Sequence, residues 1–174
     1  MAKHETKFAF IIYGNIASGK SSVAKLLGQS LPQFKHLCAD DIRIEASLSG
    51  KILSENEVYS LMVEQISQHT QVIFESTGAG NFFKHYLRQF KATGFKIVRV
   101  YLKCSPLVCY KRYQNRINTS AAMVPMAYPT NIKTSIEDIN NKISGLTCDI
   151  VFNTELYNAA IIADRLINMY GTKC

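Results

Sequence analysis

Residues 14 to 21 constrain the fold of this chain more than any other segment. They read GNIASGKS and fit the pattern G-x-x-x-x-G-K-[ST]. The apolar run KFAFIIY at 7–13 precedes them, and a segment of helical pattern follows. An apolar strand, a glycine-rich loop and a helix in this order form a nest of main-chain amides that can surround a phosphate group. The segment therefore predicts an α/β chain with an anion site after its first strand.

Individual residues of this loop have predicted roles. Lys20 would reach the β- and γ-phosphates of a nucleotide, and the Ser21 hydroxyl would bind Mg²⁺. The other predicted nucleotide contacts are Gly14, Asn15, Ile16, Ala17, Ser18, Gly19 and Ser22. The alternative is an ordinary glycine-rich turn with an exposed lysine. ATP and Mg²⁺ are thus the expected cofactors.

Short apolar runs alternate with longer helical segments along the whole chain. The predicted strands are 7–13, 34–39, 71–74, 95–102 and 149–152. This alternation predicts a mostly parallel sheet with helices on both faces, in which a ligand binds beyond the carboxyl ends of the strands. No repeat or linker divides the chain, so residues 1–174 are expected to form a single domain.

Helix signals fall between these strands. Ser54 and Glu57 have the spacing of a capping box, and Pro106 suits the first position of a helix. Two apolar stripes at helical spacing are expected to pack in the core; they are Ile132, Ile136, Ile139 and Ile143, and Leu156, Ala159, Ala160, Ala163, Leu166, Ile167 and Tyr170. The segment 119–130 has two prolines and no periodicity, and we expect a lid at about 117–132.

Composition and charge narrow the class of protein. The net charge is +7, and no acidic residue lies between Glu75 and Glu137, so this interval should attract phosphates, nucleotides or nucleic acid unless it is only a solvated basic face.

The five cysteines form no CxxC pair and are expected to be reduced. There is no long apolar segment and no apolar leader, so we expect a cytoplasmic protein without membrane contact. Nothing in the sequence fixes the oligomeric state.

The segment CADDIR at 38–43 supplies candidate groups for phosphoryl transfer to a hydroxyl. Such a reaction needs a carboxylate to accept or orient the hydroxyl proton, and it gains from a cation that holds an anionic acceptor. Asp40, Asp41 and Arg43 provide both within four residues. The alternative is that Asp40 only caps a helix and that Arg43 lies on the surface.

The segment VIFESTGAG at 72–80 places an acid after the third predicted strand. Glu75 could bind a water of Mg²⁺ or a substrate hydroxyl, and Thr77 could contact substrate; the alternative is a solvent-exposed strand end. Asp40 is a second candidate for such a water-mediated metal contact.

Arg112 and Arg116 are four residues apart and therefore lie on one face of a helix just before the expected lid. Their guanidinium groups fit phosphate oxygens and could stabilise a transferring phosphoryl group, unless they belong to a solvated basic face. GTPases normally carry an N-K-x-D motif, and this chain has none.

Together, YGNIASGKSS, CADDIR, VIFESTGAG and YKRYQNR resemble the small P-loop kinases of the zeta-toxin-like and polynucleotide-kinase-like group. The resemblance implies a three-layer fold with a five-stranded parallel sheet of order 2-3-1-4-5, ATP as donor and Mg²⁺ as cofactor. By resemblance to the D-D-x-R motif of polynucleotide kinases, Asp40 is the general base and Arg43 contacts a phosphate of the acceptor.

Other parts of the resemblance point to a different acceptor. In zeta toxins the third strand ends in E-G-T-G, which is similar to Glu75-Ser76-Thr77-Gly78, and there the glutamate binds a sugar nucleotide. Polynucleotide kinases have an aspartate at the position of Ser76. Both groups carry lid arginines near Arg112 and Arg116, and Arg116 matches better.

These features lead to three hypotheses. The first is an ATP-dependent kinase of a small hydroxyl-bearing metabolite or sugar nucleotide. The second is a 5′-hydroxyl polynucleotide kinase, with nucleic acid as partner. The third is a protein that binds ATP without transferring phosphate.

Overall fold

The protein is an α/β sandwich built on one parallel sheet. The computed structural model describes residues 6–119 and 131–171. Five strands pair in the order β2-β3-β1-β4-β5; they are β1 (Phe8–Gly14), β2 (Lys35–Cys38), β3 (Gln71–Ser76), β4 (Lys96–Lys103) and β5 (Ile150–Asn153). Every pairing is parallel. The predicted fold class and strand order are confirmed.

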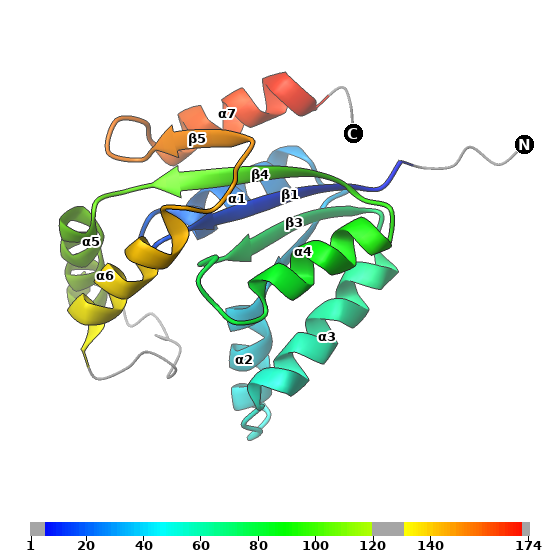
Figure 1. Cartoon of the computed structure of the whole chain (residues 1–174), viewed down its shortest axis with the longest axis horizontal. Coiled ribbons are helices and arrows are strands. Elements are labelled where there is room, and N and C mark those ends of the chain that lie inside the picture. The colour runs from blue at the N-terminus through cyan, green and yellow to red at the C-terminus, as the bar shows by residue number, and fades with distance from the viewer. Residues whose placement is uncertain (1–5, 120–130, 172–174) are drawn as a thin grey trace, which may run out of the picture.

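Helices cover both faces of the sheet and the carboxyl ends of its strands (Figure 1). They are α1 (Lys20–Ser30), α2 (Ala39–Leu48), α3 (Glu55–Gln68), α4 (Phe83–Ala92), α5 (Pro106–Thr119), α6 (Ile132–Ile143) and α7 (Ala159–Tyr170). In Figure 1, α5 and α6 lie on one side of the strand ends, and α2 lies on the other. The carboxyl ends of the strands are therefore flanked by two separate groups of helices.

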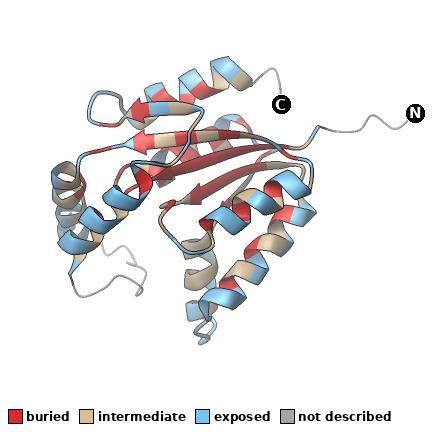
Figure 2. Cartoon of the chain, viewed as in Figure 1, coloured by how far each residue is buried: buried red, intermediate tan, exposed pale blue. Residues whose placement is uncertain are grey.

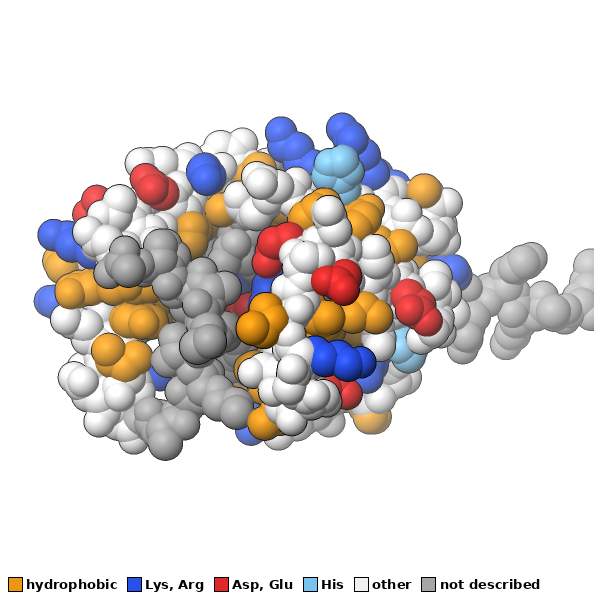
Figure 3. All heavy atoms as spheres, turned by 90° about the horizontal axis from the view of Figure 1, so that it is seen from below, with side chains coloured by type: hydrophobic (Ala, Val, Ile, Leu, Met, Phe, Trp, Pro, Cys, Tyr) orange, Lys and Arg blue, Asp and Glu red, His pale blue; other side chains and the backbone are white. Residues whose placement is uncertain are grey.

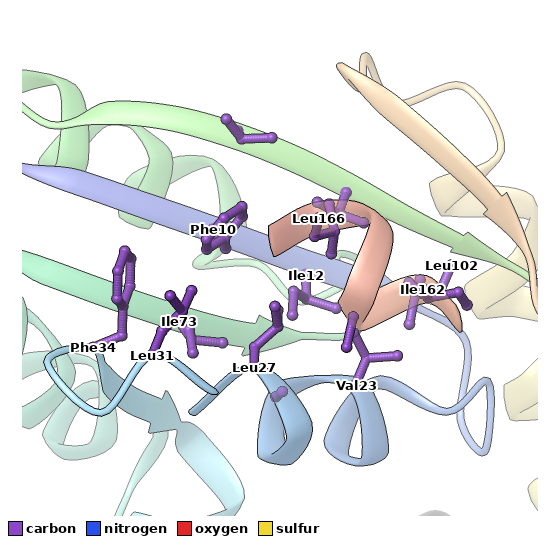
Figure 4. Close-up of a cluster of buried hydrophobic side chains, with 14 of the residues drawn as sticks. Phe10, Ile12, Val23, Leu27, Leu31, Phe34, Ile73, Leu102, Ile162 and Leu166 are labelled. Atoms are coloured by element: carbon purple, nitrogen blue, oxygen red, sulfur yellow. The ribbon is translucent and has the colours of Figure 1, made fainter. Parts of the chain in front are cut away.

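The central strand β1 explains why the sheet needs helices on both faces. All seven of its residues are buried, and its side chains alternate between two hydrophobic clusters. Phe10 and Ile12 pack with Leu27 of α1 and Leu166 of α7 (Figure 4). The second cluster joins the opposite face of β1 to α3 and α4. Figure 2 shows the buried strands between helices whose outer faces are exposed.

Local sequence signals correctly placed several helix ends. The Ser54 hydroxyl accepts a hydrogen bond from the Glu57 amide, and the Glu57 carboxylate accepts one from the Ser54 amide, so the capping box is formed. Helix α5 begins at Pro106. The expected stripe at 156–170 was wrong at two positions, because Leu156 lies before α7 and is 73% exposed, and Ala160 is exposed on α7. Helix α7 begins after Asn158, whose side chain caps it by accepting a hydrogen bond from the Ile161 amide.

The expected lid falls mostly on residues that the structure does not describe. The residues at 120–130, the main part of the expected lid, lie outside the described residues. Of its borders, Ile117–Thr119 belong to α5 and Ile132 begins α6.

Cys38, Cys104, Cys109 and Cys148 have free thiols. Within the described ranges, no helix is long and apolar enough to cross a membrane.

Candidate functional site

The glycine-rich loop connects the buried end of β1 to the start of α1. Gly19 and Ala17 have positive φ angles of 97° and 56°, which turn the chain back toward the helix axis. At Gly14, a Cβ atom would lie 2.6 Å from the Leu102 carbonyl oxygen and 2.7 Å from Ser18 Oγ. The loop therefore packs so closely on β4 that only glycine fits at its first position.

Asn15 fixes the shape of this loop. Its Oδ1 accepts a 2.8 Å hydrogen bond from the Ile16 amide, and its Nδ2 donates a 2.8 Å bond to the carbonyl oxygen of Ile136 in α6. The residue is almost fully buried. A side chain predicted to contact the nucleotide thus also ties the loop to a helix more than a hundred residues away.

Lys20 is folded back over the loop. Its Nζ donates a 2.7 Å hydrogen bond to the Asn15 carbonyl oxygen, and the residue is only 9% exposed. Burial lowers the pKa of Lys20, and the carboxylates of Glu75 and Asp40 act in the opposite direction. The Asn15 carbonyl oxygen therefore holds the ammonium group against the loop, and the charges of Glu75 and Asp40 favour its protonated form.

Ser21 and Glu75 meet at the carboxyl end of β3. The Ser21 hydroxyl donates a 2.7 Å hydrogen bond to Glu75 Oε1, and Glu75 is 6% exposed. Burial acts to raise the pKa of Glu75, but the His36 hydrogen bond, the Lys20 charge and the Ser21 hydroxyl together hold it below its ordinary value. A hydroxyl beside an ionised carboxylate provides the oxygen ligands that Mg²⁺ prefers.

His36 extends this pair, although no local sequence pattern predicts its role. Its Nε2 lies 3.2 Å from Glu75 Oε2, and its Nδ1 lies 4.0 Å from Asp41 Oδ2. The imidazole therefore links the carboxylate at the end of β3 to the first turn of α2. Among the described residues, no group of three or more His, Cys, Asp and Glu side chains has the geometry of a metal site.

The acidic pair at the start of α2 lies in the same cleft. The Asp40 side chain is 40% exposed and accepts a 2.9 Å hydrogen bond from the Arg43 guanidinium. The same guanidinium donates bonds of 2.8 and 2.9 Å to the two carboxylate oxygens of Glu55 in α3. Arg43 is thus held by two carboxylates. Its predicted contact to an acceptor phosphate stays a prediction, and its neighbour Glu55 could not be predicted from the spacing of CADDIR.

The loop after β3 presents polar groups to this cleft. The amide of Gly78 donates a 3.1 Å hydrogen bond to Ser76 Oγ, and Gly78 has a φ angle of 81° that brings it against the Tyr13 ring. Thr77 lines the cleft, as the predicted substrate contact requires. The role itself stays a prediction.

The two arginines of α5 have different surroundings. Arg112 donates hydrogen bonds of 3.0 Å to Thr154 Oγ1 and 2.7 Å to the Thr154 carbonyl oxygen, so it ties α5 to the loop after β5. Arg116 is exposed and has no hydrogen-bond or ion-pair partner within 6–119 and 131–171. Of the two arginines of α5, Arg116 alone therefore presents a guanidinium without competing contacts from the described residues.

Two cavities meet at the loop. The larger, of about 1080 Å³, is bordered by the loop, α2, the β3–α4 segment and the α5–α6 side; the predicted residues among its lining are Ile16, Ala17, Gly19, Lys20, Ser21, Ser22, Asp40, Asp41, Arg43, Glu75, Thr77, Arg112 and Arg116. The smaller, of about 290 Å³, lies between the loop, Arg112 and the segment Thr154–Ala159. The structure therefore brings the predicted residues of four separate motifs to one cleft. Gly14 and Asn15 are buried behind them, and the buried Ser18 lines the smaller cavity.

Comparisons with known proteins agree with this architecture. No protein-family profile matches the sequence, and no curated protein matches it. Among solved structures, the chain is similar to a gluconokinase from Sinorhizobium meliloti, with 16% identity, coverage of 98% and 100% of the two chains and a TM-score of 0.60. A shikimate kinase from Acinetobacter baumannii in complex with shikimate has 16% identity, coverage of 97% and 96% and a TM-score of 0.65. A fungal RNA kinase has 14% identity, coverage of 95% and 87% and a TM-score of 0.59.

Proposed function

We propose that this protein is an ATP- and Mg²⁺-dependent kinase that transfers the γ-phosphate of ATP to a hydroxyl group of a small molecule. The observation that carries the proposal is the shared cleft. In it, a carboxylate at the start of α2 faces the same space as the glycine-rich loop and the Ser21–Glu75 pair. The fold similarity to a gluconokinase, a shikimate kinase and an RNA kinase supports phosphoryl transfer as the reaction class.

The loop would hold the phosphates of ATP. Its main-chain amides and the amino end of α1 supply positive potential, and Lys20 adds a buried cation beside them. Thr154, Tyr157 and Arg112 border the smaller cavity behind the loop, which gives room for the base of the nucleotide. The donor would therefore enter from the α5 and α7 side of the cleft.

Ser21 and Glu75 would hold the metal ion. Mg²⁺ bound there would neutralise charge on the phosphate oxygens. His36 orients the Glu75 carboxylate through its second oxygen, so the first oxygen stays directed at Ser21.

Asp40 would act on the acceptor. Its carboxylate is partly exposed to the cleft and can accept the proton of an attacking hydroxyl, while Arg43 fixes its orientation. The transferring phosphoryl group gains negative charge on its outer oxygens, and the guanidinium of Arg116 can stabilise that charge.

The test is acceptor-stimulated consumption of ATP with Mg²⁺. The acceptor panel contains 5′-hydroxyl DNA and RNA, sugar nucleotides, nucleosides, sugar acids and aminocyclitols. Asp40→Asn should lower kcat by roughly two to four decades while ATP binding is kept. Asp164→Asn, an exposed substitution on α7, is the matched control. Wild-type turnover that Asp40→Asn leaves unchanged would reject the assignment of the base. Binding of ATP with no transfer to any acceptor would favour the hypothesis of a non-catalytic ATP-binding protein.

A 5′-hydroxyl polynucleotide kinase is the second candidate. The D-D-x-R run at the start of α2, the acid-free interval 76–136 and the fold similarity to an RNA kinase favour it. Phosphate contacts weaken steeply with salt, so retention on single-stranded RNA that falls between 50 and 200 mM salt is expected for this candidate. Labelling of 5′-hydroxyl oligonucleotides would establish it.

A further inference from the structure

One side of the large cleft has a composition that sets it apart from the rest. We define the acceptor wall as the lining residues of α2, of the first turn of α3 and of the segment 76–86; they are Ala39, Asp40, Asp41, Arg43, Ile44, Glu55, Ser76, Thr77, Ala79, Gly80, Asn81, Phe82, Phe83 and Tyr86. Its charged members are three carboxylates and one guanidinium. The opposite side, formed by α1, α5 and α6, contributes five cations and one acid; they are Lys20, Lys25, Arg112, Arg116 and Lys142, and Asp138. The cleft is therefore basic on the donor side and acidic on the acceptor wall.

The single cation of the acceptor wall is already bound on two sides. Arg43 donates one hydrogen bond to Asp40 and two to Glu55, and its side chain is 24% exposed. A two-bonded contact between guanidinium and carboxylate is among the stronger polar contacts in proteins. An anionic substrate at this wall would have to displace Glu55 and would then face Asp40, Asp41 and Glu55 at close range. Such like-charge contacts disfavour binding.

The same wall also carries aromatic side chains. Phe83 and Tyr86 are almost fully buried, and the half-buried Phe82 stacks on Tyr59 with 4.7 Å between ring centroids and 20° between ring planes. Tyr59 in turn packs against Tyr86 at 5.1 Å. The Phe82 ring is thus supported from behind and can receive a flat apolar group. Figure 3 shows hydrophobic and acidic side chains next to one another on the face that carries the lower ends of α2 and α3.

From these contacts we infer that the acceptor is a hydroxyl compound that carries no negative charge and presents a flat apolar ring to the acceptor wall. The inference rests on the proposed function and narrows it. The polar groups of Asp40 and Thr77 receive the hydroxyl side of such a compound, and Phe82 receives the ring. Sugar acids, sugar nucleotides and polynucleotides are anionic, and their preferential binding is the opposite outcome of the test.

The test compares three glycosides by saturation-transfer NMR, with the protein held in Mg²⁺ and a non-hydrolysable ATP analogue. Phenyl β-D-glucopyranoside has the ring and no charge, phenyl β-D-glucuronide adds one carboxylate, and methyl β-D-glucopyranoside lacks the ring. We expect the phenyl glucoside to bind at least threefold better than either of the others. Binding of the phenyl glucoside no better than the glucuronide, including the case in which neither binds, would overturn the inference.

Two variants connect this preference to the acceptor wall. Phe82→Ala should weaken binding of the phenyl glucoside roughly threefold to tenfold, and Phe82→Tyr, which keeps the ring, should restore it. Glu55→Gln should loosen Arg43 and raise binding of the glucuronide relative to the glucoside. An unchanged order of affinities in both Phe82→Ala and Glu55→Gln would show that another part of the cleft binds the probes and would overturn the inference.

The test of the acceptor wall can fail or succeed independently of the test of the kinase proposal. Binding of the ATP analogue is measured first, by calorimetry with Mg²⁺, and its absence would reject the kinase proposal. The glycoside comparison can then be repeated without nucleotide, so the selectivity of the acceptor wall is tested in either case.

Discussion

The hydroxyl of Ser21 and the carboxylate of Glu75, 54 residues apart in the sequence, lie 2.7 Å apart in the structure. The first belongs to the amino end of α1 and the second to the carboxyl end of β3, which pairs directly with β1. The parallel pairing of these two strands is what brings a loop hydroxyl and an acidic strand end together.

Glu75→Gln should weaken Mg²⁺ binding in the nucleotide complex by roughly tenfold to a hundredfold, because it removes the negative charge from the proposed metal ligand. The readout is Mn²⁺ binding followed by electron paramagnetic resonance with a bound ATP analogue. Glu137→Gln, an exposed substitution on α6, is the control. Equal Mn²⁺ affinity in Glu75→Gln and wild type would remove Glu75 from the metal site.

His36→Gln should weaken metal binding in the same assay by a smaller factor than Glu75→Gln. The expected cause is loss of the 3.2 Å contact that orients the second oxygen of Glu75. If the loss exceeded that of Glu75→Gln, His36 would have to act on the metal directly.

Lys20→Ala should weaken ATP binding by about tenfold or more, since the buried ammonium is the charge nearest the loop and hydrogen bonds to charged groups contribute about 1.5–3 kcal/mol. Calorimetric titration with Mg²⁺ and an ATP analogue measures this. Lys51→Ala, which changes an exposed lysine, should bind as wild type does. If Lys20→Ala bound ATP as tightly as wild type, the proposal that this loop binds the phosphates of ATP would be wrong.

Asn15→Ala should lower the free energy of unfolding by about 1–3 kcal/mol, because the buried Ile136 carbonyl and Ile16 amide both lose their partner. Urea unfolding gives the value, with Asn115→Ala on the exposed side of α5 as the reference. A loss of less than half a kcal/mol would mean that the loop does not depend on its contact with α6.

Asp149 gives a pH dependence of stability with a definite sign. Hydrogen bonds from Arg99 lower the pKa of Asp149 below its ordinary value of 3.8. The stabilisation is therefore complete above that value and is lost as the pH falls through the lower folded-state pKa. We expect Asp149→Asn to lower Tm at pH 7 and the difference from wild type to shrink below about pH 4. A Tm difference between wild type and Asp149→Asn that stays constant from pH 7 to pH 3 would argue against a stabilising ion pair between Arg99 and Asp149.

The sequence predicted the scaffold of the site better than its contacts. The loop at 14–21 and the acids after two strands were found because each is a local pattern, and parallel strand ends lie at one edge of a sheet. The contact between Arg43 and Glu55 could not be found in this way, since it depends on the angle between α2 and α3 rather than on spacing.

His36 is a second residue whose contacts could not be predicted from local sequence patterns. It lies in a strand of four residues with little alternation, and only the register of β2 against β3 places it near Glu75. Arg112 was predicted from its helical spacing with Arg116, but its partner Thr154 belongs to a loop 42 residues further on. Tertiary geometry, rather than local pattern, thus decided which predicted groups are free and which are paired.

The proposed phosphate site at the beginning of α1 would couple the amount of folded protein to the supply of its ligand. Gly19 offers no side chain to cap this helix, and its first turn has no acidic residue, whereas the side chains of Ser54, Asn131 and Asn158 cap α3, α6 and α7. A phosphate bound there would take the place of a cap and would stabilise only the folded chain. By mass action, ligand at a hundred times its Kd adds about 2.7 kcal/mol to the free energy of unfolding. In a cell, a fall in nucleotide concentration would then lower both the activity of this protein and its resistance to proteolysis.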